Sequence, residues 1–415
     1  MSSPAQEPAG LPLYAGPSLP RWQPRSADDL EAALADGTLT EHHWVDVKRE
    51  VGSGDGAKKE LARDLASFAN DGGCYLIGIA EDKPTQTFTL EPAALAGLAE
   101  KIDQVVRSRC DPPLYVACHP LTLPGDPERG VLLVEIPPSP LAPHMVDGVY
   151  WGRGDSTKHK LSDNEVARLH ALRIARHRTA EQLIQRERNR DPTPSAMREH
   201  SHLFVVAEPL ASPPDLLDPL LGTSNLNSLV QRVPQLGQGY ATSPSWQSLS
   251  SDEPRAAGWG WHSFDLPGRI VNADAREKRL LDLEVSDDGR VALFAGRGSD
   301  SAAGQSFILE RVALSLTRNV LTLAAQLGAS SGYAGRWLLA VGLTDLAGKQ
   351  ASRATDGGFY RDEFPRFSAP DYVQGTEANT RELLDQPGAV TRRLLRRLLR
   401  ALGVEQDHAG LLGDE

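Results

Sequence analysis

The sequence predicts an α/β domain in the N-terminal part of the chain and a second, α+β domain after it. In residues 26–190, short apolar runs of strand length alternate with segments whose apolar residues recur at helical spacing, a pattern typical of α/β domains. The sequence Asp-Pro-Thr-Pro at 191–194 ends this alternation, because proline stops a helix. Beyond it, a hairpin pattern at 280–295 and a helical segment at 307–327 indicate an α+β domain.

The length of 415 residues is enough for two domains that each bury a hydrophobic core. Residues 1–25 carry Pro, Gly and Ser without apolar periodicity, so we expect a disordered N-terminal arm. We place the first domain at 26–190, a linker at 191–200 and the second domain at 201–415.

The cysteines and the hydropathy pattern exclude several classes of protein. Cys74, Cys110 and Cys118 form no Cys-x-x-Cys pair, so they give neither a disulfide framework nor a zinc site, and we expect buried thiols. No apolar run approaches the length of a membrane span, and no signal peptide pattern is visible. We therefore expect a cytoplasmic protein with no membrane partner.

The first helix is expected at 26–35, where Ser26 and Asp29 have the spacing of a capping box and Gly37 follows as a stop. The next segment, 41–82, has the clearest local signals, because a β-branched and aromatic run, a glycine-rich stretch and a long apolar run follow one another. It predicts a strand at 44–47, a loop at 52–56, a helix at 57–69, a turn at 70–73 and a buried strand at 74–80.

In the helix expected at 57–69, the apolar residues Leu61, Leu65 and Phe68 recur at helical spacing. The charged residues are expected largely on the other side of this helix: Lys58, Lys59, Arg63 and Asp64.

The remaining elements follow from the same signals. The first domain continues with a return strand at 85–90, a helix at 95–106, strands at 114–118 and 131–136, an edge strand at 150–153, and one long helix from 164 to about 190. The second domain begins with a strand at 203–207 and long loops or disorder over 211–257, followed by hairpin strands at 280–285 and 291–295, a helix at 307–327 and a buried strand at 337–343.

Carboxylates lie at both ends of the segment 41–82, with Glu41 and Asp46 before the helix and Glu81 and Asp82 after the buried strand. Strands joined by a helical crossover often lie side by side, so these groups are expected at one edge of the sheet. Converging carboxylates repel one another unless a cation neutralises them, and Mg²⁺ or Mn²⁺ prefers such oxygen ligands. Lys48 lies on the strand face of Asp46, where its ammonium group is suited to hold a phosphate.

Several sequence blocks resemble those of the Schlafen-type AlbA-like family over residues 26–190. The matching blocks are Glu41, Asp46-Val47-Lys48, Phe68-Ala69-Asn70-Asp71-Gly72-Gly73, Ile77-Gly78-Ile79-Ala80-Glu81-Asp82, and the set Tyr150, Arg153, Ser156 and Thr157. One departure is that Asp46 stands where the family usually has Glu.

The resemblance implies an α/β Schlafen/AlbA-like fold and a nucleic-acid-binding protein, with a metal-dependent endoribonuclease as the favoured activity. Active relatives cleave transfer and ribosomal RNA at a three-carboxylate site, which implies Glu41, Asp46 and Asp82 as ligands of Mg²⁺ or Mn²⁺, with Glu81 as a substitute and Lys48 beside them. The alternative is a non-catalytic DNA-binding or transcriptional regulatory module that uses the same surface. Vertebrate relatives pair two such lobes in one chain, so a homodimer is a further expectation.

The charge balance argues against indiscriminate coating of long duplexes. The formal net charge is −11, and residues 41–190 contain 20 Lys and Arg against 22 Asp and Glu. Contact with RNA or single strands must therefore come from a local patch. Two patches are candidates, Lys58, Lys59 and Arg63 after the glycine-rich loop, and Arg153, Lys158 and Lys160 near the edge strand.

Three further features of the sequence bear on its ligands. The glycine-rich loop lacks the Gly-x-x-x-x-Gly-Lys-Ser/Thr pattern, so no ATP is expected. His42 and His43 flank the acidic pair and are candidates for an extra ligand or base, although exposed histidines are more often neither. Near the C-terminus, one helix carries five arginines on one face, Arg392, Arg393, Arg396, Arg397 and Arg400, and a leucine stripe on the other. It is suited to nucleic acid or anionic lipid, but packing of the stripe in its own domain or on a partner is favoured.

Overall fold

The computed structural model describes residues 16, 22, 24–82, 84–85, 87–176, 178–213, 216–218, 220–221, 224–237, 239–302, 304–352 and 365–413. Most of the predicted N-terminal arm lies outside these residues. The described residues divide into two compact units, the first made of residues up to 176 with 210–213 and 328–335, and the second of the remainder. The division near 177 precedes the linker that we predicted at 191–200.

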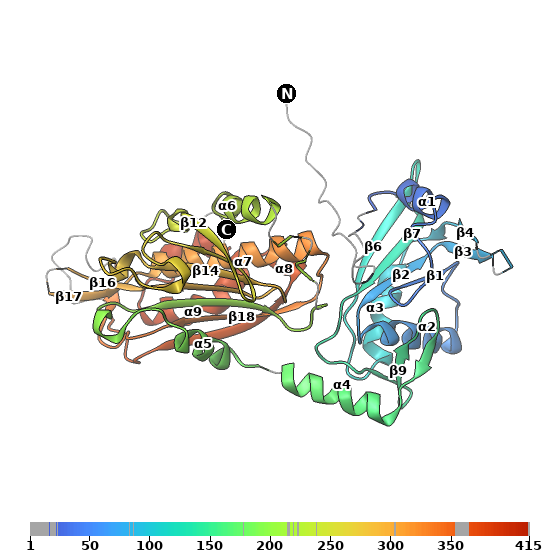
Figure 1. Cartoon of the computed structure of the whole chain (residues 1–415). Helices are drawn as coiled ribbons and strands as arrows, with labels where there is room; N and C mark the ends of the chain where they lie inside the picture. Colours follow the sequence, from blue (N-terminus) through green and yellow to red (C-terminus); the bar gives the residue numbers. More distant parts are fainter. Residues whose placement is uncertain are drawn as a thin grey trace. The chain divides into compact units, whose positions relative to one another are not determined.

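The first unit is built on a five-stranded sheet in the order β1-β2-β7-β5, with β6 also pairing with β7 (Figure 1). Its strands are β1 Val45–Lys48, β2 Gly73–Ile77, β5 Ala93–Ala94, β6 Ala117–Leu123 and β7 Asp126–Ile136. β1 is parallel to β2, and the other pairs are antiparallel. A three-stranded sheet follows, made of β8 Met145–Val146, β9 Val149–Arg153 and β10 Lys158–Lys160.

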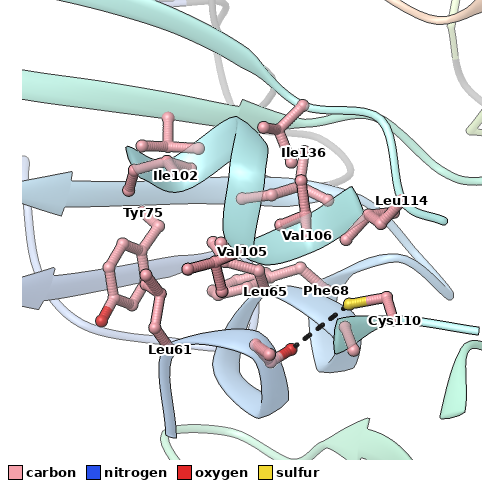
Figure 2. Packing of buried hydrophobic residues seen from close by; sticks show 14 of the residues in the cluster. Leu61, Leu65, Phe68, Tyr75, Ile102, Val105, Val106, Cys110, Leu114 and Ile136 are labelled. Atoms are coloured by element: carbon pink, nitrogen blue, oxygen red, sulfur yellow. Dashed lines mark hydrogen bonds between the residues drawn. The ribbon is translucent and has the colours of Figure 1, made fainter. Parts of the chain in front are cut away.

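Helices cover both faces of the five-stranded sheet. They are α1 Ala27–Ala35 on one face, and α2 Asp55–Phe68 and α3 Leu98–Arg109 on the other. Helix α4 Asp163–Arg176 follows the three-stranded sheet in the chain. Figure 2 shows the core on one face, where Leu61, Leu65 and Phe68 of α2 meet Ile102 and Val106 of α3. A second cluster, with Leu30 of α1 and alternate residues of β1 and β2, fills the other face. The predicted capping box of Ser26 and Asp29 at the start of α1 is confirmed.

The predicted continuous strand at 74–80 is wrong in one respect, because Gly78 divides it. Gly78 has φ +113°, and a Cβ there would lie 2.8 Å from the carbonyl oxygen of Gly130, so glycine is needed at this position. After the break, β3 Ile79–Asp82 pairs with β4 Thr87–Leu90 in a separate two-stranded sheet. The return strand predicted at 85–90 is thus confirmed with a shorter span.

Two other predictions in this part of the chain are corrected. The strand expected at 114–118 begins only at Ala117, and Leu114 instead packs into the core below α2 and α3. The long helix expected from 164 to 190 is two helices, because Thr179 forms a capping box with Gln182 and starts α5 Ala180–Asn189. Glu187 of α5 accepts a hydrogen bond from the buried Arg290, which ties α5 to the second unit.

The second unit contains an antiparallel seven-stranded sheet in the order β12-β13-β14-β15-β11-β18-β20. Its strands are β11 Leu203–Pro209, β12 Ser251–Arg255, β13 Gly258–His262, β14 Leu281–Ser286, β15 Val291–Ala295, β18 Arg336–Leu343 and β20 Tyr372–Asn379. A small sheet joins β16 Ser299–Ala302, β17 Gln305–Ile308 and β19 Gln350–Ala351. The predicted hairpin and the predicted strands at 203–207 and 337–343 are confirmed.

The helices of this unit after α5 are α6 Ser224–Gly237, α7 Glu310–Ser331, α8 Thr380–Asp385 and α9 Pro387–Ala401. Short 3₁₀ turns lie at Ser195–Met197, Trp246–Ser248, Pro267–Arg269, Glu277–Arg279 and Gln406–Leu412. Helix α6 and strand β12 correct the expectation of loops or disorder over 211–257. Helix α7 begins later than predicted, because residues 305–308 form β17.

Helices α5 and α9 pack on opposite faces of the seven-stranded sheet. A Cβ on Gly375 of β20 would meet Ala180 of α5, whereas the adjacent Gln374 side chain contacts Arg397 of α9. The leucine stripe of α9 is fully buried, with Leu394, Leu395 and Leu398 at 0 % exposure. The packing alternative for this helix is therefore confirmed.

The cysteines are free thiols, as expected. Cys74 and Cys110 are buried and Cys118 is half-buried. Burial raises the pKa of all three thiols, to about 12 for Cys110 and about 11 for Cys118. In the part of the chain that the structure describes, none of the helices combines the length and the apolar character that a membrane span needs.

Candidate functional site

Strand β1 presents Asp46 and Lys48 on the sheet face that α2 covers, because residues two apart share a face. The Asp46 side chain is only 4 % exposed, and the Nζ atom of Lys48 donates to its Oδ1 atom at 2.7 Å. The Lys48 side chain is 40 % exposed. The predicted pair is therefore formed, with Asp46 buried and the side chain of Lys48 partly exposed.

Arg153, at the end of β9, fills the space behind this pair. Its Nη1 atom donates to Oδ2 of Asp46 at 3.2 Å, and its Nη2 atom donates to the carbonyl oxygens of Val45 and His42 at 3.1 and 3.3 Å. Its guanidinium group lies 4.3 Å from the ring centroid of Phe68, and its side chain is 2 % exposed. A phosphate cannot reach a cation buried in this way, so the contact predicted for Arg153 is replaced by a structural role.

Glu41 lies beside the same arginine, with Oε1 at 3.8 Å from Nη2 of Arg153. Its pKa is raised from 4.5 to about 7. Burial is the largest cause and repulsion by Asp46 adds to it, while Lys48 and Arg153 offset part of the shift. Glu41 can therefore gain or lose a proton near neutral pH, as acid–base catalysis requires.

Asp64 of α2 interacts with Asp46 and forms with Glu41 and Asp46 a group called the carboxylate cluster below, although its charge predicts the outer side of the helix. It is buried and accepts a hydrogen bond from Lys158 of β10. Burial raises the pKa of Asp64, and the Asp46 carboxylate raises it further. Its spacing was the missed signal, because Leu61, Asp64, Leu65 and Phe68 follow the i, i+3, i+4, i+7 pattern of a buried stripe.

Glu81 and Asp82 are not part of this cluster. Both are exposed at the end of β3, where Asp82 pairs with Thr87 in the β3–β4 hairpin. Asp46 lies beside Tyr75, in the middle of β2. Glu81 comes after the end of β2 at Ile77 and after Gly78, where the chain changes direction. Among the described residues, which include all four predicted ligands, no three His, Cys, Asp or Glu side chains form a group able to hold a metal ion.

The cluster also does not fit the divalent ion that the family resemblance implies. Both oxygens of Asp46 are engaged, one by Lys48 and the other by Arg153. A guanidinium group at this distance would repel a second cation. The negative charge of the cluster is thus neutralised by three cationic side chains, those of Lys48, Arg153 and Lys158. This arrangement needs no metal ion.

The lysines of the predicted patch on β10 lie next to the predicted patch on α2, whereas Arg153 is buried. Lys158 of β10 donates to Glu60 and Asp64 of α2, which joins the hairpin of β9 and β10 to the helix. The surface, called the basic surface below, consists of Lys58, Lys59, Arg63, Lys158 and Lys160.

Carboxylates partly neutralise the basic surface. Asp147 lies 3.9 Å from Nζ of Lys59 and 3.6 Å from Nη2 of Arg63, and Asp55 lies 3.6 Å from Lys59. Within the described part of the chain, Lys58 and Lys160 show no such ion pair. These two lysines are therefore the most available to an anion.

The glycine-rich loop and the two histidines have local partners. Asp55, the first residue of α2 after this loop, is bound by Arg109 and Lys59, so the helix start already holds a carboxylate. The Nδ1 atom of His43 lies 3.1 Å from the carbonyl oxygen of Gly154, and its Nε2 atom lies 3.3 Å from Asp71. His42 accepts a hydrogen bond from the Trp44 amide, and burial lowers its pKa. Neither histidine contacts the carboxylate cluster through its ring.

Comparison with known proteins agrees with the sequence resemblance. No match was found among curated proteins. Among solved structures, the N-terminal domain of a protein related to the ATP-dependent DNA helicase RecG from Nitrosomonas europaea is 21% identical, with a TM-score of 0.24, over 34% of this chain and 94% of that one. The DIP2311 protein from Corynebacterium diphtheriae is 15% identical, with a TM-score of 0.21, over 56% of this chain and 43% of that one. Residues 41–162 match the family described as Schlafen, AlbA_2, and this N-terminal part of the chain is therefore a Schlafen AlbA_2 domain.

Proposed function

We propose that this protein binds nucleic acid, as RNA or as single strands, through the basic surface on α2 and β10. The observation that carries the proposal is the contact of Lys158 with Glu60 and Asp64, because it makes one surface of two patches that are about 100 residues apart in the chain. The family of residues 41–162 supports the same class of ligand.

The charges of the surface favour a compact or single-stranded ligand over a long duplex. Lys58 and Lys160 would meet phosphates directly, whereas Lys59, Arg63 and Lys158 would first have to exchange carboxylate partners. Such exchange makes each contact weaker than one from a free lysine. Affinity would then come from a few phosphates at one place, and it would fall as salt is added.

The direct test measures fluorescence anisotropy of labelled single-stranded RNA, single-stranded DNA and duplex DNA with the full chain. We expect Lys58→Ala combined with Lys160→Ala to weaken binding and to reduce the slope of log K against log salt by about 1.4, since each lost single-strand phosphate contact removes about 0.7. Arg107→Ala is the control, because this exposed arginine of α3 pairs with Asp103 outside the surface. Unchanged binding by the double variant would refute the proposed surface.

RNA cleavage is the second candidate function, and the raised pKa of Glu41 favours it. In this reaction, ionised Glu41 takes the proton of a ribose 2′-hydroxyl, and the 2′-oxygen forms a bond to the adjacent phosphorus. The bond from phosphorus to the 5′-oxygen breaks, and this oxygen takes a proton from water. Lys48, whose side chain is 40 % exposed and whose Nζ atom is bound to Asp46, would neutralise the phosphate charge. The products are a 2′,3′-cyclic phosphate and a 5′-hydroxyl end.

Incubation with transfer RNA, single-stranded RNA and single-stranded DNA separates cleavage from binding. If Glu41 acts as proposed, RNA but not DNA is cut, the reaction persists in EDTA, and Glu41→Gln abolishes it without loss of RNA binding. Retarded migration of all nucleic acids without any cut product would contradict cleavage. It would leave a binding module, and preference for duplex DNA would then identify the regulatory alternative.

We also propose that two copies of this chain associate to place two basic surfaces on one ligand, because residues 41–162 supply one Schlafen AlbA_2 domain to such a pair. Light scattering on the eluting peak of a sizing column would show twice the mass of 44.9 kDa. A mass of one chain at the highest soluble concentration would contradict this association.

A further inference from the structure

A groove of about 420 Å³ lies between α9 and β20 in the second unit. Its lining combines arginines of the helix with Gln374, Gly375 and Thr376 of the strand, and the arginines are Arg392, Arg393, Arg396 and Arg397. The opposite side of the same helix is the buried leucine stripe. Packing therefore fixes the helix and leaves its guanidinium groups along an open groove.

Positive charge exceeds negative charge around Arg396, Arg397 and Arg400. Among the described residues, Glu405 and Glu382 lie within ion-pair distance of arginines of this helix. Glu405 is shared, since it lies 2.7 Å from Nε of Arg396 and 3.3 Å from Nε of Arg400. Arg397 donates to the neutral amide oxygen of Gln374 at 3.2 Å. Within the described part of the chain, Arg396, Arg397 and Arg400 thus share one carboxylate, that of Glu405.

We infer that this groove binds an oligophosphate, a small ligand with two or more linked phosphoryl groups. Guanidinium groups match phosphate oxygens with paired hydrogen bonds, and residues 392–397 span only about 8 Å of helix, at about 1.5 Å per residue. The volume is in the range of small-molecule sites. Among the residues that the structure describes, no aromatic side chain lines the groove, so recognition rests on phosphate and not on stacking of a base.

The two carboxylates argue for a compact anion and against an extended backbone. Glu405 contacts the row formed by Arg392, Arg396 and Arg400, whereas Glu382 contacts Arg393 in the next row of the helix. An extended polyanion that followed α9 would pass close to both acids and be repelled by them. A short ligand between the rows meets Arg397 and the Thr376 side and, among the described residues, lies close to one carboxylate only, the Glu405 that contacts Arg396.

Isothermal titration calorimetry of the full chain with inorganic tripolyphosphate tests this inference. We expect one site per chain, binding at least tenfold tighter than that of orthophosphate, and weaker binding at higher salt. Arg396→Gln and Arg397→Gln should each weaken tripolyphosphate binding about tenfold, the usual effect of losing a charge-assisted hydrogen bond. Both residues are exposed, so the variants should keep the fold, which thermal unfolding checks.

Arg381→Gln is the matched control, because this arginine of α8 is 75% exposed, pairs with Asp385 and does not line the groove. Equal binding by all three variants, or no binding by the parent chain, would overturn the inference. A parallel titration with single-stranded RNA is the second arm. If RNA binding alone depends on Arg396 and Arg397 and tripolyphosphate does not bind, the groove is a backbone contact and the oligophosphate site is refuted.

Discussion

Arg153 and Asp46 are 107 residues apart in the chain, and they meet in the core of the first unit with Nη1 at 3.2 Å from Oδ2. The same guanidinium group satisfies the carbonyl oxygens of Val45 and His42. It therefore fastens the three-stranded sheet to the start of β1. The carboxylate cluster is neutralised by this contact together with Lys48 and Lys158.

Arg153→Ala is expected to destabilise the first unit by about 3–5 kcal/mol, because Oδ2 of Asp46 and two carbonyl oxygens would lose their buried hydrogen-bond donor. Urea denaturation at neutral pH measures the loss. Arg107→Ala, which removes a 68% exposed arginine, should change stability by less than about 1 kcal/mol. Equal effects of the two substitutions would show that the buried contact is not stabilising.

The pH dependence of stability should report on Glu41, whose pKa rises from 4.5 in its ordinary state to about 7 in the folded protein. Between these values the folded protein holds the proton more tightly than the unfolded chain, so this contribution to stability is present below pH 4.5 and lost as the pH rises through about 7. Glu41→Gln stays neutral at every pH. It should be more stable than the parent at pH 8 by about 1 kcal/mol, a value reduced by solvent screening, and equal at pH 4. The same difference at both pH values would contradict the raised pKa.

Divalent metal should have little effect on the protein, because Lys48 and Arg153 already engage Asp46. We expect the thermal midpoint to be the same with Mn²⁺, with Mg²⁺ and with EDTA. Asp46→Asn is the control for a site at the cluster. A midpoint that rises with Mn²⁺ in the parent chain, but not in Asp46→Asn, would show that the carboxylates rearrange to bind the ion.

The sequence predicted most elements of the fold because their signals are local. The capping box at Ser26, the helix over residues 57–69 and the apolar strand of β7 each depend on neighbours in the chain. The break at Gly78 depends instead on the close approach of Gly130, which no local pattern records. The sequence did not predict helix α6, because the segment around it is rich in polar residues and proline. Its apolar residues, including Leu226 and Val230, are buried only by packing within the second unit.

The candidate site was predicted in part for the same reason. Asp46 and Lys48 share a strand face, so their contact follows from spacing alone. The position of Arg153 depends on how β9 packs against β1, which is a long-range contact. In the sequence alone, an arginine of a basic patch cannot be distinguished from a buried arginine. Contact of Asp46 with Glu81 and Asp82 was expected because residues 74–80 were predicted to be one continuous strand. Gly78 divides this segment into β2 and β3, so the expectation is wrong.

Helix α9 allows its two faces to be tested separately. Leu398→Ala should cost about 2–5 kcal/mol, because Leu398 is fully buried and its removal leaves a cavity. Arg397→Ala on the other face should change stability by less than about 1 kcal/mol. Chemical denaturation of the two variants measures both values. Similar losses would mean that the arginine face is also packed in the folded protein.

The most direct test of the central claim is ultraviolet crosslinking of single-stranded RNA that contains 4-thiouridine, followed by mass spectrometry of the attached peptides. The account predicts crosslinks in the peptides of α2 and of the β9–β10 hairpin, around Lys58 and Lys160, and their loss when both lysines are replaced by alanine. Crosslinks that lie only outside residues 41–162 would contradict it.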